Sequence, residues 1–555
     1  MPYKRMTILT DDAKREIGQH FVFGFHGHEV SENIETLIRD YHLGSVILMK
    51  RNVKDAKQVR KIIRELQRIA KESGHAKPLL IGLVSAFSSP TAGTQFPGAM
   101  ALAATGDVDL TFKVSAATAK ELKMVGINWA YSPVADVNSD SRNPVIGVRS
   151  FGDEPVDVAR YAVAVARGLT SGGVAPSAKH FPGHGDTHVD SHLALPRITK
   201  SKDELKKTEL VPFDELVRDA DPVASVMVGH MALPGLTGDF TPASLSSKVT
   251  KGLLREEMGY KKVVVTDCLE MDAIAEPLQG GCGVEEGAVR SLVSGVDVVM
   301  VCHTYERHVG SMESVYAAVE DGRLDLNELL EGGRRVSKMK DAFVGGWDDV
   351  LKDGGDAIFD AEWKALKAEN GELSKRAYQM SSAVVWGAEK LPLKVAKERE
   401  VMLFTPEMES LNRAVDDADD VLRDRGGRVR NTAGASYLNL ADQIQQRAKT
   451  THVVYSSEED VVAITDRVGA VVFVLRNADR SVWQRQYMEK VLTVCREIPV
   501  VLLASCGPYD LVGEDELRDK TAYVASFEFT REAFEAVVGV VFDGAEGRGR
   551  VPVLT

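Results

Sequence analysis

Asp267 is a carboxylate that the sequence places at the end of an apolar run. It follows three consecutive valines and Thr266 in KVVVTDCLE, which begins at Lys262. If this run is a buried strand, the strand holds the carboxylate in a fixed position. An acidic residue at a strand end is more often a cap or an ion-pair partner than a nucleophile, so its role depends on the groups around it.

Asp190 and His192 form a second candidate for chemistry, since only one residue separates them. In an extended segment both side chains emerge on the same side, where the carboxylate can contact the imidazole. A neighbouring carboxylate raises the pKa of a histidine from ~6.5 and keeps it protonated near neutral pH. A proton donor and a nucleophilic carboxylate on one face are the minimum equipment for retaining glycoside hydrolysis. The alternative is a chance pair in a surface loop.

A metal site is a further interpretation of the same segment, because its histidines recur at intervals of four. They are His180, His184, His188 and His192. On a helix this spacing would stack the imidazoles on one face. Pro182, Gly183 and Gly185 argue against a helix, and no HExxH motif is present. We therefore predict no metal, and a zinc-binding loop stays open as the alternative.

The elements that must position these groups are eight apolar runs in the first 345 residues. They begin at Phe21, Gly44, Pro78, Ile127, Pro176, Ser225, Lys262 and Gly295. Amphipathic segments lie between them, with apolar residues spaced by three and four. This alternation predicts a (β/α)8 TIM-type barrel, in which the strand ends carry the active site. A doubly wound open sheet is the alternative.

The composition changes near Gly345, where a polar stretch without strand patterns begins. We expect a barrel over residues 1–345, a linker and helix over 346–375, and a second domain over 376–555. Six strand-like runs separated by helical patterns predict a smaller α/β layered sandwich in this last part.

Charge and cysteine usage limit the partners of the 555-residue chain. Its formal net charge is −13, which would repel nucleic acid and anionic membrane surfaces on average. The five cysteines are scattered and form no CxxC, which argues against disulfides or a thiolate zinc site. No secretory signal and no spanning helix of ~18 apolar residues are evident. We expect a cytoplasmic protein that binds neither nucleic acid nor membranes.

Several motifs resemble, in order, those of glycoside hydrolase family 3 in its two-domain β-N-acetylglucosaminidase branch. They are SVILMKRN from Ser45, QFPGAMALAAT from Gln95, SPVADVN from Ser132, NPVIGVRSFG from Asn143 and KHFPGHGDTHVDSH from Lys179. The last is the most diagnostic. The resemblance covers the first ~345 residues, and the second domain is similar only in pattern.

The resemblance implies a role for each matching residue. Asp267 would be the nucleophile, His192 the general acid/base and Asp190 its partner. The hydroxyls of the terminal sugar would be bound by Arg149, Lys179 and His180. Asp136 would lie beneath them as a charge partner, with a purely structural role as the alternative. No cofactor is implied.

The chain departs from the family pattern after the third predicted strand. Family members carry an Asp-Gln-Glu-(Gly/Asn)-Gly element there, whose aspartate holds the terminal sugar, whereas this chain has IGLVSAFSSPTAGTQFPG. Either a short deletion follows Gly82, or Val84 replaces the aspartate; an error in the gene model is the third explanation. No carboxylate remains between Pro78 and Gly98.

We therefore expect a retaining exo-acting β-N-acetylglucosaminidase that acts on oligosaccharides or glycosides containing N-acetylglucosamine. The absent aspartate predicts weakened activity. The alternative is a sugar-binding protein of the same fold with impaired catalysis. The natural glycan, the oligomeric state and the choice between water and phosphate as acceptor are not predictable from these residues.

Overall fold

The computed structural model of the chain describes residues 9–83, 92–187, 195–221, 223–276, 281–352, 354–407, 433–457 and 462–554. Its contacts divide the chain into two compact units, and both are discontinuous in sequence. Unit 1 comprises Met1–Gln95, Thr111–Asn143 and Glu154–Gly371. Unit 2 comprises Phe96–Leu110, Pro144–Asp153 and Glu372–Thr555.

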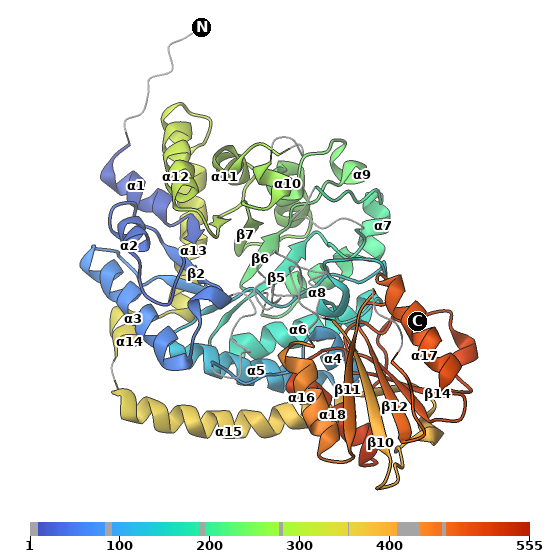
Figure 1. The fold of residues 1–555 in the computed structure, drawn as a ribbon. Helices are drawn as coiled ribbons and strands as arrows, with labels where there is room; N and C mark the ends of the chain where they lie inside the picture. The colour runs from blue at the N-terminus through green and yellow to red at the C-terminus, as the bar shows by residue number, and fades with distance from the viewer. Residues whose placement is uncertain are drawn as a thin grey trace. The chain divides into compact units, whose positions relative to one another are not determined.

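Unit 1 is a closed barrel of eight parallel strands in sequence order (Figure 1). The strands are β1 (Phe21–Phe23), β2 (Ser45–Leu48), β3 (Leu80–Leu83), β4 (Trp129–Ala130), β5 (Ala175–Phe181), β6 (Ser225–Val228), β7 (Val263–Cys268) and β8 (Val298–Val301). Pairing of Val22 in β1 with Met300 in β8 closes the barrel. The TIM-type prediction is confirmed, and the open-sheet alternative is wrong.

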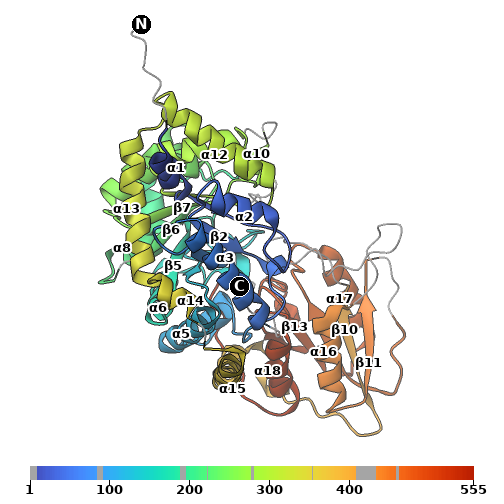
Figure 2. The ribbon, with the colours of Figure 1, turned by 90° about the vertical axis from the view of Figure 1, so that its left-hand side faces the viewer.

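Helices surround these strands, as Figures 1 and 2 show. The longer ones are α1 (Asp11–Gly18), α2 (Glu32–Arg39), α3 (Ala56–Glu72), α5 (Val108–Val125), α6 (Pro155–Ser171), α8 (Leu210–Arg218), η5 (Lys248–Glu257), α11 (Val284–Val293), α12 (Tyr305–Glu320) and α13 (Leu326–Phe343). In α3 the Asp55 side chain accepts a hydrogen bond from the Gln58 N–H and caps the first turn. Val59, Ile62 and Leu66 form its buried face.

Two irregularities in the barrel ladder occur where the sequence predicts chemistry. Ala178 of β5 pairs with Val226 of β6, but Phe181 pairs with Val228, so β5 has one extra residue between these two pairs. The same happens in β7, where Val265 pairs with Val298 but Cys268 pairs with Met300. An extra residue in a strand re-aims the side chains around it.

The sheet of unit 2 has the order β11-β10-β12-β13-β14-β9. The strands are β9 (Ala383–Trp386), β10 (Glu400–Pro406), β11 (Thr450–Tyr455), β12 (Val468–Leu475), β13 (Val500–Ala504) and β14 (Thr521–Ala525). All pairs are parallel except β14 with β9. Neighbouring residues on a strand face opposite sides, so Leu403 and Phe404 belong to different cores.

Helices cover both faces of this sheet and complete the predicted layered sandwich. The core of Phe404 includes Tyr487 and Val491 of α17 (Val482–Val494). The core of Leu403 includes residues of α16 (Gly434–Gln445) and α18 (Arg531–Phe542). The boundary between the two units falls inside the long helix α15 (Asp356–Ser381).

Helix α4 (Ala99–Ala104) belongs to unit 2 although it precedes β4 in the chain. Met100 and Ala104 are completely buried in the same core as Phe404. The Arg550 N–H donates to the Ala104 carbonyl at 2.8 Å. The core of unit 2 is therefore completed by a segment from the first part of the sequence.

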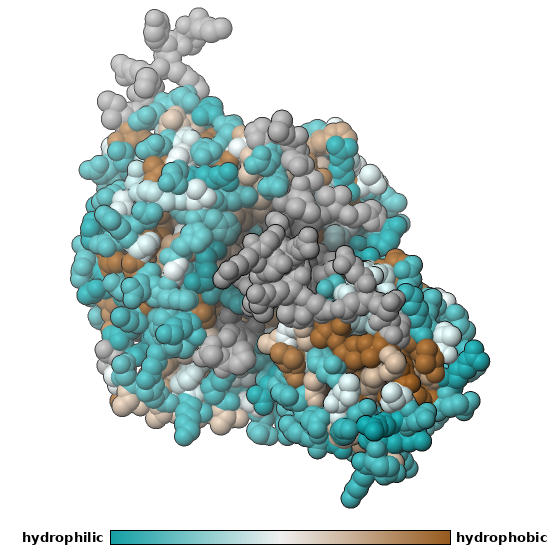
Figure 3. All heavy atoms as spheres, in the orientation of Figure 1, coloured by the Kyte–Doolittle hydropathy of each residue, from teal (hydrophilic) through white to brown (hydrophobic). Residues whose placement is uncertain are grey.

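Figure 3 shows where hydrophilic and apolar side chains lie on one face of the molecule. Hydrophilic side chains predominate over unit 1, whereas apolar side chains gather over the strands of unit 2. In the parts of the chain that the structure describes, no helix is long and apolar enough to cross a membrane.

Candidate active site

His180 lies between two carboxylates at the carboxyl ends of the barrel strands. Its Nδ1 atom is 2.7 Å from Asp136 Oδ2, in the segment after β4. Its Nε2 atom is 3.9 Å from Asp267 Oδ2 at the end of β7. The fold thus brings together three of the residues that the sequence singled out.

Asp136 organises the end of β5. Its side chain is fully buried and accepts hydrogen bonds from the backbone N–H of His180, at 3.1 Å, and of His184, at 2.7 Å. Burial raises the pKa of Asp136, but the contacts with His180 and His184 outweigh it and bring the pKa below its ordinary value. Asp136 is therefore an ionised acceptor that fixes the backbone on either side of Phe181.

Burial and the neighbouring carboxylates shift the pKa of His180 in opposite directions. Burial lowers its pKa more strongly than the neighbouring Asp136 raises it. Because the ionised Asp136 can only accept, Nδ1 carries a proton, and Nε2 faces Asp267. Nε2 can form a hydrogen bond with a hydroxyl group there, as a sugar-binding residue would.

Asp267 has the charge state that a nucleophile needs. Its side chain is 21% exposed, and its Oδ1 accepts a hydrogen bond from the Cys268 N–H at 2.8 Å. Burial raises the pKa of Asp267, but His180, His230 and Lys179 together lower it to about 2. The carboxylate is ionised throughout the neutral range.

His230 supports this strand end from the segment that follows β6. It is completely buried, with Nδ1 at 2.8 Å from Ser244 Oγ and Nε2 at 2.9 Å from the Cys268 carbonyl. Since a carbonyl only accepts, Nε2 carries the proton. His230 therefore holds the backbone next to Asp267.

Lys179 lies in β5 and is buried. Its N–H donates to the Pro133 carbonyl at 3.0 Å, and its carbonyl accepts from the Ala135 N–H at 2.6 Å. Arg149 lies in the short helix η3 (Gly147–Arg149), where Nη1 donates to the Val145 carbonyl at 3.0 Å. Arg149 belongs to unit 2.

Asp190 and His192 lie outside the described residues, and so does the segment 84–91 after β3. The loop after β5 is described as far as Thr187. There Asn143 Nδ2 donates to the His184 carbonyl at 2.8 Å and to Thr187 Oγ1 at 3.2 Å. The base of the loop that carries the predicted acid/base is thus fixed.

Some supporting residues were not predicted from the sequence. Glu209 is completely buried, and Lys200 donates to its Oε1 at 2.5 Å while lying 3.2 Å from Asp186. These three residues connect the loop after β5 to α8. Burial of an acidic residue at the start of a helix has no local sequence signal, which is why Glu209 was missed.

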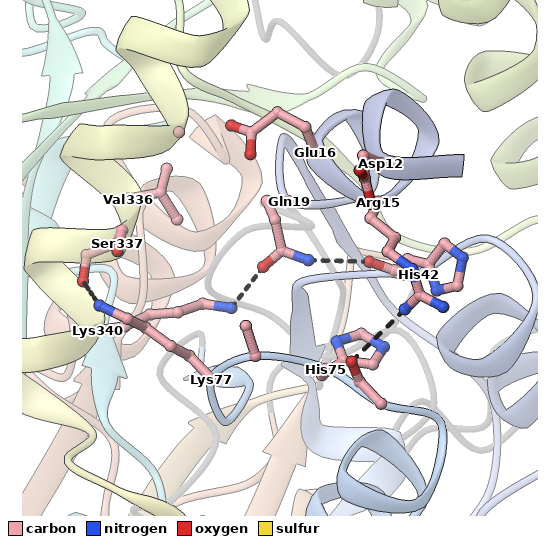
Figure 4. Close-up of a pocket in the computed structure, with 13 residues that line it drawn as sticks. Asp12, Arg15, Glu16, Gln19, His42, His75, Lys77, Val336, Ser337 and Lys340 are labelled. Carbon is pink, nitrogen blue, oxygen red and sulfur yellow. Dashed lines mark hydrogen bonds between the residues drawn. The ribbon is translucent and has the colours of Figure 1, made fainter. Parts of the chain in front are cut away.

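A cavity of about 240 Å³ lies at the other end of the barrel (Figure 4). It is lined by residues that precede β1, β2 and β3 and by residues of α13. Lys340 is buried there and donates to Gln19 Oε1 at 2.7 Å. Burial lowers the pKa of Lys340 to about 7. Because catalytic groups of such barrels lie at the carboxyl ends, this cavity is not the site.

One group of possible metal donors occurs among the residues that the structure describes. Cys268, Cys302 and His303 each offer an atom, and these atoms lie within 4.8 Å of one another. In the histidine-rich loop, Nδ1 of His180 contacts Asp136 and Nδ1 of His184 lies 2.9 Å from Thr187 Oγ1.

Comparisons with known proteins agree with the resemblance seen in the motifs. The profile of the glycosyl hydrolase family 3 N-terminal domain matches residues 13–339. Beta-hexosaminidase A of Pseudoalteromonas piscicida is 33% identical over 336 residues, which cover 55% of this chain and 54% of that protein. The chain thus spans about half the length of this relative. A beta-hexosaminidase of Neisseria meningitidis serogroup B is 32% identical over 283 residues, 49% of this chain and 75% of that protein.

Solved structures extend the similarity to unit 2. A family 3 beta-N-acetylglucosaminidase from a Paenibacillus species has a TM-score of 0.82 and 30% identity, with 99% of each chain covered. A fungal multi-domain beta-N-acetylglucosaminidase has a TM-score of 0.86 and 33% identity, covering 98% of this chain and 60% of that one. A beta-glucoside phosphorylase at 19% identity shares the fold.

Proposed function

The chain belongs to glycosyl hydrolase family 3, and on that premise we propose that it is a retaining, exo-acting β-N-acetylglucosaminidase. The observation that carries the proposal is the ionised Asp267 at the end of β7, beside His180 that Asp136 holds in place. The substrate class is supported by the beta-hexosaminidase and beta-N-acetylglucosaminidase names of the relatives.

The proposed reaction has two steps with inversion at each, so the configuration is retained. Asp267 attacks the anomeric carbon while His192 protonates the leaving oxygen, and a covalent glycosyl-enzyme forms. His192 then takes a proton from water, which attacks the anomeric carbon and releases Asp267. Asp190 would keep His192 charged before the first step.

Sugar recognition in the barrel would come from His180 and Lys179. The position of His180 Nε2, 3.9 Å from Asp267 Oδ2, supports a hydroxyl contact at this point. The absent carboxylate after β3 removes one charge-assisted contact, which contributes about 1.5 to 3 kcal/mol. We propose that this loss lowers catalytic efficiency while the chemical groups stay in place.

The test compares hydrolysis of aryl β-N-acetylglucosaminide with that of aryl β-glucoside, with the product anomer followed by NMR. We expect preference for the first substrate and a β-anomeric product. Asp267→Ala should lower turnover by roughly 10⁴-fold or more, as loss of a nucleophile does. A fluoroglycoside inactivator should label Asp267 in the native chain.

The matched control is Asp203→Asn, which removes an exposed carboxylate in α7 (Lys202–Lys207). Its turnover should equal that of the native chain. His192→Ala should be slow on poor leaving groups and much less affected on activated aryl glycosides. An α-anomeric product, or a native chain with no turnover, would show that the proposal is wrong.

A further inference from the structure

Two cysteines and a histidine meet at the barrel mouth. Cys268 ends β7, and Cys302 and His303 follow β8 directly. Both sulfur atoms and one ring nitrogen of His303 lie within 4.8 Å of one another. In the sequence the cysteines are scattered, which argued against a thiolate metal site. The pairing of β7 with β8 brings two of them together.

The extra residue in β7 turns Cys268 toward this point. Val263 and Val265 lie two residues apart in the apolar cluster to which all eight strands contribute. The next member of that cluster from β7 is Cys268, three residues further on. The irregularity in the β7–β8 register therefore lets both Asp267 and Cys268 face the barrel mouth.

The backbone that carries the other two donors is held firmly. Glu270 accepts hydrogen bonds from the N–H groups of Cys302, His303 and Thr304, at 2.9, 2.5 and 3.1 Å. Arg51 Nη2 donates to the Cys302 carbonyl at 2.6 Å. Such outer contacts orient ligands before a metal arrives.

The three side chains differ in exposure in a way that suits entry of an ion. Cys268 and Cys302 are buried, whereas His303 is exposed. An ion can reach the exposed imidazole first and then the two sulfur atoms. A tetrahedral cation with bonds of ~2.0 to 2.3 Å would draw together the three donor atoms, which lie within 4.8 Å of one another.

We propose that Cys268, Cys302 and His303 bind a thiophilic divalent cation of the Zn²⁺ class, and that the bound ion inhibits the enzyme. Two thiolates and an imidazole are ligands that select such ions. Each thiol releases its proton to solvent when the metal–sulfur bond forms. The fourth position stays open for water or for Asp267.

Inhibition follows from the position of the nucleophile. Asp267 precedes Cys268 directly and accepts its N–H, so the ion would lie beside the carboxylate. A divalent charge there would neutralise Asp267 or coordinate it, and either event prevents attack on the sugar. This part of the proposal rests on the proposed function; binding of the ion does not.

The binding test uses Co²⁺ added to the full, reduced chain. Thiolate ligation should give a near-ultraviolet charge-transfer band that saturates at one equivalent, and Zn²⁺ should displace it. In Cys302→Ser the affinity should fall by more than the ~10- to 100-fold loss that follows removal of an outer contact. Cys282→Ser is the control, because Cys282 lies outside the donor group, and should keep the band.

His303→Ala provides a second variant, since this exposed side chain can be removed without disturbing the core. It should weaken the band to a similar extent, with an unchanged melting temperature. Absence of the band in the native chain, or an unchanged band in both variants, would overturn the proposal.

Activity is measured separately on the aryl β-N-acetylglucosaminide. Zn²⁺ should inhibit hydrolysis by the native chain, and a chelator should restore the activity. Inhibition of Cys302→Ser to the same extent should need at least tenfold more Zn²⁺. A chain with the band but no activity keeps the metal site and refutes the proposed function. Equal inhibition of native chain and Cys302→Ser places the inhibitory ion elsewhere and refutes this inference.

Discussion

Asp136 is the residue whose replacement should most clearly separate structure from chemistry. In Asp136→Asn the buried carboxylate that accepts from His180 and His184 is lost, and breaking such a buried pair costs about 3 kcal/mol. We expect a lower melting temperature and a lower kcat/KM. Because the pKa of Asp136 is lowered in the folded state, its stabilisation is present above the unfolded value of about 3.9. The difference in free energy of unfolding between the variant and the native chain should therefore shrink as the pH falls below that value.

Equal stability of Asp136→Asn and the native chain at pH 7 would contradict this prediction.

The contact between Asp136 and His180 was not predictable, because these residues are far apart in sequence and meet only when β4 and β5 pair. The resemblance suggested a charge partner beneath the sugar. The structure identifies His180 and the His184 backbone as the groups that it holds.

Lys340 provides a residue-scale prediction on stability. Burial, with Lys77 nearby, lowers its pKa to about 7 in the folded chain, against an ordinary value of 10.5. The unfolded chain then binds more protons between these values, so stability rises with pH by up to about 1.4 kcal/mol per unit. Lys340→Met removes this pH dependence. The free energy of unfolding of the variant should therefore exceed that of the native chain most below pH 7, and the difference should shrink above pH 7.

Urea unfolding between pH 6 and pH 9 measures this effect. Lys338→Met is the control, because it removes the same charge from an exposed position of α13. The free energy of unfolding of this control should change with pH in parallel with that of the native chain. If the free energy of unfolding of Lys340→Met also changes in parallel, the buried amine is not the titrating group.

At the scale of elements, β3 makes the sugar-recognition hypothesis testable. Gly82 pairs with Trp129 and Leu83 with Ala130, so the strand continues regularly through Leu83. Inserting Ile-Asp-Gln-Glu-Asn-Gly between Gly82 and Leu83 places the new isoleucine in the register position of Leu83. The new aspartate then follows the strand end. We expect kcat/KM on the aryl β-N-acetylglucosaminide to rise at least about tenfold, which corresponds to about 1.4 kcal/mol.

A matched insertion with Asn in place of Asp tests the charge and should give little gain. The melting temperature must show that both inserted chains fold. If the native chain already equals the repaired one, another residue holds the sugar and the argument from the missing carboxylate fails.

The strands show what the sequence could and could not predict. All eight apolar runs of the barrel and all six of unit 2 contain a strand. In the fourth run the regular strand is limited to Trp129–Ala130, although backbone hydrogen bonds to β5 continue at Ser132, Pro133 and Ala135. The position of β9 beside β14, antiparallel to it, was not predictable, since local patterns do not specify which strands pair.

At the scale of the whole molecule, the two units are not separable by one cut. A chain of residues 1–371 would contain α4 without the core that buries it, and exposing Met100 costs about 2 kcal/mol. We expect this fragment to bind a hydrophobic dye and to aggregate. Coexpression of residues 372–555 should restore solubility. A monomeric fragment that melts cooperatively without binding the dye would contradict this.

The remote segments of unit 2 also determine when it can fold during synthesis. The Leu554 N–H donates to Asp153 Oδ2 at 2.7 Å across 401 positions, and α4 lies still earlier in the chain. At roughly 5 to 20 residues per second, a ribosome needs tens of seconds to reach the partners of α4. During that interval Met100 and Ala104 have no core to enter, whereas each barrel strand can pair with its predecessor as it emerges. Closing so long a loop is slow, so unit 2 is completed only after Leu554 has been synthesised.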